Sequence, residues 1–314
     1  MKILKYCDEL KGDWDCFNMN SKMPLFMFNR DYMEYHKDRF NDNSLLFYDD
    51  KDELLAILPA TVQDGILTSH GGLTYGGFIL SNSVKQHTVN DLFSELIKYA
   101  KKNEIKKIIY KTIPHIYHMQ GAEEDFYSLF LNNASIKKIE PSTIINLEVP
   151  LKMPKGRKAQ VGRARREGVL IKECCDFDTF IDLENEVLKD RHDTKAVHSG
   201  NELALLKGFF PNNIRLFGAF YEEKMIAGTL IYEYQNVIHT QYMAANDLAR
   251  EIGALDFTIA TVIDKYKESK RYLDFGISSE NGGRILNEGL ISQKEGFGGR
   301  AIMYDTYEID INKK

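Results

Sequence analysis

The sequence lacks the features of a disulfide-rich, metal-rich or membrane-spanning protein. Its four cysteines are Cys7, Cys16 and the adjacent pair Cys174 and Cys175. Neither their spacing nor their histidine neighbours fit a CxxC motif, so we expect neither a metal site nor a redox site. No apolar run approaches the roughly 18 residues that cross a bilayer, and the N-terminus lacks the apolar core of a signal peptide. We therefore expect a cytoplasmic protein, for which peripheral contact with a membrane stays open.

A strong excess of charge of one sign is also lacking. The 314 residues include 41 basic and 46 acidic side chains, which give a net charge of -5. Such a balance creates no global field that would draw the whole molecule to nucleic acid or to an anionic membrane. No recognition-helix motif accompanies the basic residues, and the aromatic residues are scattered, so DNA is not an expected partner. The length favours two domains of ordinary size.

What the chain does contain is one pattern of elements repeated twice. Residues 44–66 and 215–238 both alternate between apolar and polar side chains around a tight acidic turn, so each predicts a β-hairpin. In each copy another strand follows, then an amphipathic helix, then a last strand. The helices are expected at 89–104 and 255–269, where apolar residues recur at helical spacing.

The repeat predicts an α/β protein with two similar domains, each a mixed sheet flanked by helices, and a ligand cleft between them. The basic segment LKMPKGRKAQVGRARREGV separates the two copies. We therefore expect an N-terminal domain at 1–150 and a C-terminal domain at 151–314.

Five motifs accompany this order of elements: RDYMEYHKDRF, SHGGLTYGG, GRKAQVGRARREGV, LDFGISSENGG and QKEGFGGR. Together they resemble the tandem GNAT acyltransferases, as found in the Fem-type aminoacyltransferases and their acyl-CoA-using relatives. The resemblance covers most of the chain. It implies two tandem GNAT-like domains whose sheets are mostly antiparallel, with the donor site in the second domain.

The resemblance also implies an activity. It points to transfer of an acyl group, with acetyl as the first choice, from acetyl-CoA or another acyl-CoA to an amine of a phosphate-bearing sugar or cell-envelope precursor, with no metal. One alternative is Fem-type transfer from aminoacyl-tRNA to a peptidoglycan-type precursor, for which tRNA would be a partner. Others are acylation of a hydroxyl group and a non-catalytic module that binds a nucleotide sugar or acyl-CoA.

The donor site is expected where the strand of the second copy leads into its long helix. A helix N-terminus carries unpaired N–H groups and partial positive charge, which suit a pyrophosphate, and Gly253 would let that group approach the backbone. The family pattern ends in a second small residue, whereas REIGAL has Leu255 in that place. The other interpretation is a helix start that uses the glycine for packing. Residues assigned to cofactor binding are Arg250, Glu251, Ile252, Gly253 and Ala254.

The catalytic candidates follow from the needs of acyl transfer. An amine must lose a proton, the carbonyl must be polarised, and the leaving thiolate must gain a proton. Lys294 matches, by the resemblance, a lysine that stabilises charge on the acyl carbonyl. Asp274 or Glu280 would orient or deprotonate the amine, and Tyr242 would protonate the thiolate. Each has a plainer alternative, such as a lysine at a helix end or an aspartate that caps a turn.

The acceptor site is expected around two stretches. In ILTSHGGLTYGGFIL, four glycines permit close backbone approach while polar side chains face a substrate; the alternative is a bulged strand with His70 in the core. In the basic segment, arginines suit phosphate, although such a run is more simply a solvated helix face. The residues assigned to substrate binding are His36, Ser69, His70, Tyr75, Arg157, Arg163, Arg191 and His192.

Overall fold

The computed structural model describes residues 1–192 and 195–313, with backbone only for 190–192. The chain forms two compact units. Unit 1 comprises Met1–Glu140, Asn281–Arg284 and Met303–Lys314, and unit 2 comprises Pro141–Glu280 and Ile285–Ile302. This division differs from a single cut after residue 150, because two late segments of the chain return to unit 1.

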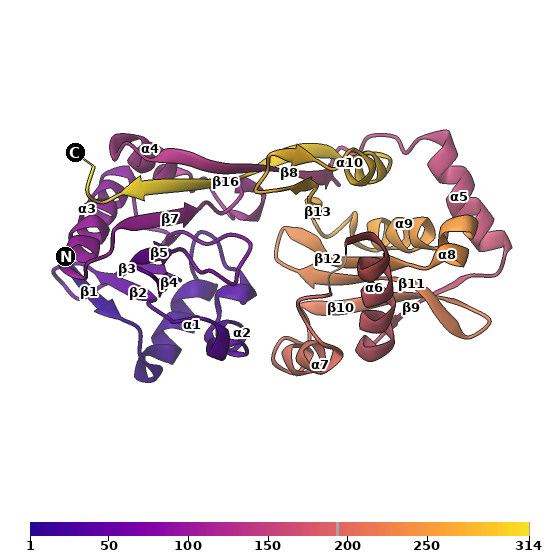
Figure 1. Ribbon diagram of the computed structural model, residues 1–314, viewed down its shortest axis with the longest axis horizontal. Helices are drawn as coiled ribbons and strands as arrows, with labels where there is room; N and C mark the ends of the chain where they lie inside the picture. The colour runs from indigo at the N-terminus through magenta and orange to yellow at the C-terminus, as the bar shows by residue number, and fades with distance from the viewer. Residues whose placement is uncertain (193–194, 314) are drawn as a thin grey trace. The chain divides into compact units, whose positions relative to one another are not determined.

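Unit 1 contains two groups of hydrogen-bonded strands (Figure 1). The first is antiparallel and has the order β1-β2-β3-β6, with bounds Lys2–Lys5, Leu45–Tyr48, Leu54–Leu58 and Ile79–Leu80. In the second, β5 pairs with β4 antiparallel and with β7 parallel, and β7 pairs with the end of β16; these strands are Thr61–Gln63 (β4), Ile66–Thr68 (β5), Lys107–Lys111 (β7) and Arg300–Asp310 (β16). Strand β8, Ser135–Asn146, begins in unit 1 and ends in unit 2.

Helices cover the strands of unit 1. They are α1 (Lys11–Met19), α2 (Arg30–Glu34), α3 (Gln86–Lys102) and α4 (Glu124–Leu131), with short 3-10 turns at Asp8–Leu10, Phe26–Phe28, Lys37–Arg39 and His115–Tyr117. The predicted amphipathic pattern of α3 is confirmed, because its apolar positions form one buried face. From that face Phe93 contacts the rings of Phe78 and Tyr110, each with centroids 5.2 Å away.

Unit 2 is built on strands in the order β8-β13-β12-β11-β10-β9. Only β12 and β13 are parallel; the other neighbours are antiparallel. The strands are Leu170–Cys174 (β9), Ile214–Tyr221 (β10), Lys224–Glu233 (β11), Val237–Ala245 (β12) and Tyr272–Ile277 (β13), followed by the small hairpin Ser279–Glu280 (β14) and Ile285–Leu286 (β15). The helices are Lys155–Arg166 (α5), Phe177–His192 (α6), Gly200–Phe209 (α7), Asp247–Ile252 (α8), Ala254–Tyr266 (α9) and Glu288–Glu295 (α10).

Helices α6 and α9 lie on opposite faces of this sheet (Figure 1). Buried residues of α9, including Ile259 and Val262, form a core with Ile231 of β11. A side chain at Gly228 of the same strand would instead meet the ring of Phe180 in α6, 2.9 Å away. Successive residues of a strand point to opposite faces, and 228 and 231 are an odd number of positions apart, so the two helices cover different faces.

Both predicted hairpins are confirmed. Strand β2 pairs with β3 and strand β10 with β11, and the aligned residues Ala56 and Ala227 pair with Phe47 and Ala219. Each hairpin also carries a register shift close to its turn.

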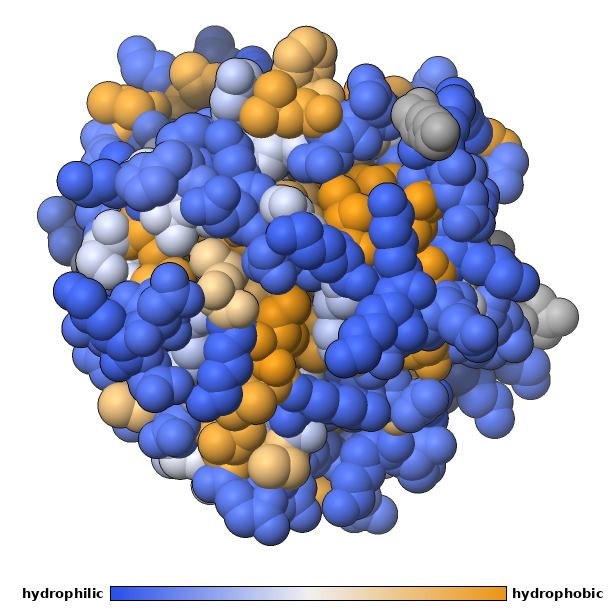
Figure 2. Space-filling model, turned by 90° about the vertical axis from the view of Figure 1, so that its left-hand side faces the viewer, coloured by the Kyte–Doolittle hydropathy of each residue, from blue (hydrophilic) through white to orange (hydrophobic). Residues whose placement is uncertain are grey.

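Hydrophilic side chains dominate the face of the molecule in Figure 2, with apolar patches between them. Across residues 1–192 and 195–313, every helix is too short or too polar to cross a membrane.

Candidate functional site

The two parallel strands of unit 2 stop pairing with each other near their carboxyl ends. Strands β12 and β13 are paired from Val237 and Tyr272 to His239 and Asp274. Beyond that point β12 continues along β11 to Ala245, while β13 follows β8. A register shift in β12, next to Thr240, increases its local twist. The edge of β12 that faces β13 is thus open to a ligand.

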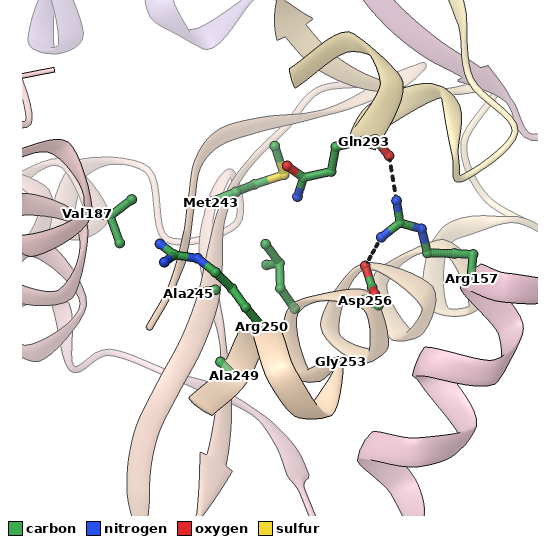
Figure 3. A pocket seen from close by; sticks show the side chains of 10 residues that line it. Arg157, Val187, Met243, Ala245, Ala249, Arg250, Gly253, Asp256 and Gln293 are labelled. Carbon is green, nitrogen blue, oxygen red and sulfur yellow. Dashed lines mark hydrogen bonds and ion pairs between the residues drawn. The ribbon is translucent and has the colours of Figure 1, made fainter. Parts of the chain in front are cut away.

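A cavity of about 240 Å³ lies at this edge (Figure 3). Its wall includes Val187 of α6 and Leu255 of α9, which come from opposite faces of the sheet. The cavity therefore extends past the open edge of β12. Its lining consists of Arg157, Val187, Met243, Ala245, Ala249, Arg250, Gly253, Leu255, Asp256 and Gln293.

A histidine and an aspartate lie side by side where the strands separate. Asp274 is fully buried, and its Oδ2 is 3.0 Å from Nδ1 of His239 on the neighbouring strand. Its Oδ1 accepts hydrogen bonds from Ser142 Oγ at 2.6 Å and from the backbone N–H of Gly276 at 2.9 Å. A carboxylate at Nδ1 favours the tautomer with a proton there, which leaves Nε2 as a base. Sequence reasoning selected Asp274 but missed His239, since only the parallel register brings the two together.

Tyr242 lies further along β12, and its hydroxyl is 2.7 Å from Nδ1 of His198. Burial raises the pKa of Tyr242 to about 12, so the phenol keeps its proton at neutral pH. Glu184 of α6 is near enough to raise that pKa further. Burial also raises the pKa of Glu184 to about 7, and its Oε2 has no hydrogen-bond partner within the described part of the chain.

Lys294 of α10 is buried against the end of β13. Its Nζ donates to the carbonyl oxygens of Gly276 and Ile277, at 2.9 and 2.7 Å. Burial lowers the pKa of Lys294 to about 8, although the charge of Asp274 acts in the opposite direction. Two of its three N–H donors thus hold the strand that carries Asp274. The remaining catalytic candidate, Glu280, is exposed in β14 and accepts a hydrogen bond from Asn287 Nδ2 at 2.8 Å.

The structure gives Gly253 a role in packing. It ends α8 and begins α9 with φ +78°, and its N–H is bonded to the carbonyl of Ala249. A β-carbon here would lie 2.6 Å from the backbone oxygen of Gln160 in α5. The neighbour that approaches the glycine is therefore α5, which supports the interpretation of Gly253 as a packing residue. That the same glycine admits a phosphate stays a prediction.

The other residues assigned to cofactor binding are spread over different surroundings. Ile252 and Ala254 are buried, so their side chains belong to the core. Glu251 is exposed and bonded to Arg163. Arg250 lies at the cavity (Figure 3). Its guanidinium is 2.7 Å from Asp247 Oδ1. Of the five, Arg250 offers a charged group to a ligand there.

The basic candidates of α5 are paired within unit 2. Arg157 forms an ion pair with Asp256 in the first turn of α9 and donates to the carbonyl of Gln293 at 3.1 Å (Figure 3). Its guanidinium carbon also lies 4.4 Å from the ring centroid of Phe297. Arg163 donates to the carbonyl of Glu251 at 2.8 Å and to its carboxylate at 3.0 Å. Their charges are thus largely neutralised. The side chains of the remaining two candidates, Arg191 and His192, lie outside the described residues.

The candidates in unit 1 are buried. His36, Ser69, His70 and Tyr75 are each at most 3% exposed. Ser69 Oγ accepts the backbone N–H of Lys111 at 2.8 Å. Burial lowers the pKa of His70 to about 3, so this imidazole is neutral.

The glycines of this loop serve close packing. A β-carbon at Gly76 would lie 2.4 Å from the carbonyl oxygen of Ser69, and the ring of Tyr75 packs 4.9 Å from that of Tyr117. His70 and Tyr75 thus pack inside unit 1, as in the alternative interpretation of His70, whereas Gly71, Gly72 and Thr74 of the same stretch are exposed. The role of SHGGLTYGG as a wall of the acceptor site stays a prediction. Among all described residues, no group of three His, Cys, Asp or Glu side chains is arranged to hold a metal.

Comparison with known proteins gives similarity of fold. No family model and no curated sequence matches the chain. Among solved structures, FemX is similar over 99% of this chain and 98% of its own, with a TM-score of 0.70 and 10% identity. L-PGS from Bacillus licheniformis is similar over 91% of this chain and 93% of its own (TM-score 0.61, 14% identity). A tandem GNAT protein from the clavulanic acid biosynthesis pathway is similar over 100% and 99% (TM-score 0.54, 9% identity). The predicted architecture is confirmed: the chain has a Fem-like tandem GNAT fold.

Proposed function

We propose that unit 2 is an acyltransferase, which moves an acyl group from a CoA thioester to an amine of a phosphate-bearing sugar or cell-envelope precursor. Acetyl is our first choice for the acyl group. One observation carries the proposal: β12 and β13 separate beside a cavity, and the His239–Asp274 pair lies where they part. The fold, which is similar to that of FemX and of a tandem GNAT protein, supports it.

The open edge of β12 suits the donor. A pantetheine arm is extended and contains amides, so it can pair with free backbone groups as an added strand does. Arg250 supplies a cation at the cavity for the diphosphate of the same donor. The thioester carbonyl would then lie toward the point where the strands part, near His239.

The chemistry needs one base and one acid. His239 Nε2 takes a proton from the attacking amine, while Asp274 holds the other ring nitrogen protonated and stabilises the imidazolium. The amine nitrogen forms a bond to the acyl carbon, and the C–S bond breaks as the tetrahedral intermediate collapses. The Tyr242 hydroxyl donates its proton to the departing thiolate. Lys294 fixes β13 and places positive charge near the developing oxyanion.

The test compares donors and then removes the base. Thermal shifts with acetyl-CoA, aminoacyl-tRNA and nucleotide amino sugars identify the donor, and thiol release measures turnover. We expect acetyl-CoA to stabilise the protein and His239→Ala to lower turnover about 10²- to 10⁴-fold. The matched control is His87→Ala, an exposed histidine in α3 of unit 1.

Three results would contradict the proposal. Stabilisation by charged tRNA alone would favour the Fem-type alternative, and stabilisation without turnover would favour a binding module. Full turnover by the His239 variant would remove the assigned base.

A further inference from the structure

Helix α5 carries a basic face on the side opposite its buried residue. Ala164 is the buried residue of this helix, and α5 lies beside α8 and α9 (Figure 1). At 100° per residue, the opposite side contains Lys155, Ala159, Gly162 and Arg166, flanked by Lys158 and Arg165. We call the four cations Lys155, Lys158, Arg165 and Arg166 the basic face; all four are exposed.

Among the described residues, no ion pair holds the basic face to unit 2, although the exposed Arg165 contacts that unit through its guanidinium carbon, 5.1 Å from the ring centroid of Phe257 in α9. The arginines that form ion pairs are Arg157 and Arg163, which bind Asp256 and Glu251. Within residues 1–192 and 195–313, no carboxylate forms an ion pair with the four side chains of the basic face. Helix α5 contains no acidic residue, whereas the whole chain has a net charge of -5. The basic face is therefore a local positive surface on an acidic protein.

Two exposed apolar side chains precede the helix. Val149 is 72% and Leu151 is 50% exposed, and the exposed Lys152 follows them directly. Apolar side chains next to several cations are what binding at a membrane interface requires, because a single weak signal gives only marginal attachment. Nucleic acid would favour aromatic side chains for stacking, and α5 has none. The small residues Ala159 and Gly162 let the helix backbone come close to a surface.

We propose that the basic face, together with Val149 and Leu151, docks unit 2 on an anionic phospholipid bilayer. The cations bind lipid phosphates, and the two apolar side chains enter the interface between headgroups and acyl chains. The basic face does not include the His239–Asp274 pair. An experiment can therefore refute membrane docking without refuting acyl transfer, and the reverse.

The test measures binding of the full chain to phosphatidylcholine vesicles with and without phosphatidylglycerol. We expect binding only to the anionic vesicles, and weaker binding as salt is added. Each cation near such a surface contributes about fivefold, so changing all four residues of the basic face to Gln should weaken binding several-hundred-fold, to order of magnitude. Val149→Ser with Leu151→Ser should weaken the binding that remains at high salt.

A matched variant tests whether vesicle binding depends on where the positive charges lie and not only on the net charge of the protein. Changing four exposed lysines of unit 1 to Gln alters the net charge equally and should leave vesicle binding unchanged; these are Lys85, Lys101, Lys102 and Lys106. Circular dichroism confirms that each variant is folded.

Three results would overturn the proposal. The first is equal loss of vesicle binding in both quadruple variants, and the second is no binding of the unaltered protein to anionic vesicles. The third is binding of duplex RNA or tRNA, but not of vesicles, that depends on the basic face; the surface would then be a nucleic-acid site. Thiol release, measured without vesicles, should be the same in all variants.

Discussion

Replacing Asp274 by Asn tests the proposed base most directly. The Asn Oδ1 keeps an acceptor for Ser142 Oγ and for the N–H of Gly276, which lie at 2.6 and 2.9 Å from Asp274. The hydrogen bonding changes at the 3.0 Å contact with His239, where an NH₂ donor now faces Nδ1, and loss of the Asp274 charge also lets the pKa of Lys294 fall. Nδ1 of His239 must then accept a hydrogen bond from this NH₂ group, so the ring proton moves to Nε2. Nε2 can then no longer act as the proposed base.

The expected loss follows from that one contact. A hydrogen bond to a charged group contributes about 1.5–3 kcal/mol, or roughly 10- to 150-fold in rate, and the wrong tautomer adds to this loss. We therefore expect the Asp274→Asn variant to lose about 10²- to 10³-fold in kcat for thiol release. Its KM for the donor should change little, because Asp274 is fully buried and meets no donor group.

Two measurements make the result decisive. Histidine nitrogen chemical shifts report whether the tautomer of His239 has switched, and steady-state kinetics report kcat. Ser142→Ala is the control, since it removes a bond to Oδ1 but keeps the contact with His239. If the tautomer switches and kcat stays within about twofold of the unaltered protein, His239 is not the base.

Three further predictions concern stability and turnover. Gly253→Ala should destabilise the protein by about 3 kcal/mol in urea unfolding, because the residue has a positive φ and its new β-carbon would clash with Gln160. The control Gly208→Ala, in the open part of α7, should stabilise the protein by about 1 kcal/mol. Similar changes in unfolding free energy for both variants would refute the packing role of Gly253. Glu184 has a folded pKa of about 7, above its unfolded value, so its stabilising effect is present below about pH 4.5 and is lost as the pH rises through 7. Glu184→Gln should therefore match the unaltered protein near pH 4 and be more stable at pH 8, by up to about 3 kcal/mol, and a pH-independent difference would contradict the burial of a neutral carboxyl. Lys294→Ala should lower kcat far more than donor affinity, because it frees the end of β13, and unchanged turnover would remove that role.

The elements that could be predicted from the sequence are those that a short local pattern determines. The hairpins and the amphipathic helices follow from periodicities of two and of about 3.6 residues, which short stretches contain in full. The local pattern also predicts a helix start next to Gly253. It does not contain the contact of that glycine with the backbone of α5, which lies almost a hundred residues earlier in the chain.

The site was predicted only in part, for the same physical reason. Asp274 stood out as a carboxylate at a strand end, whereas His239 becomes meaningful only through the register of two parallel strands. His70 and Tyr75 are polar enough to suggest a binding site, yet burial decides their surroundings. Burial is a property of the whole fold, which a stretch of glycines and polar residues does not reveal.

The return of β16 to unit 1 bears on how the protein is made. Strand β7 pairs with β16 through Lys107–Lys111 and Thr306–Asp310, about two hundred positions apart in the chain. On the ribosome, synthesis proceeds from the N-terminus, so β7 emerges long before its partner and exposes an unsatisfied edge meanwhile. The first unit to be synthesised is therefore the last to be completed, and a premature stop near residue 300 would leave its sheet open to aggregation.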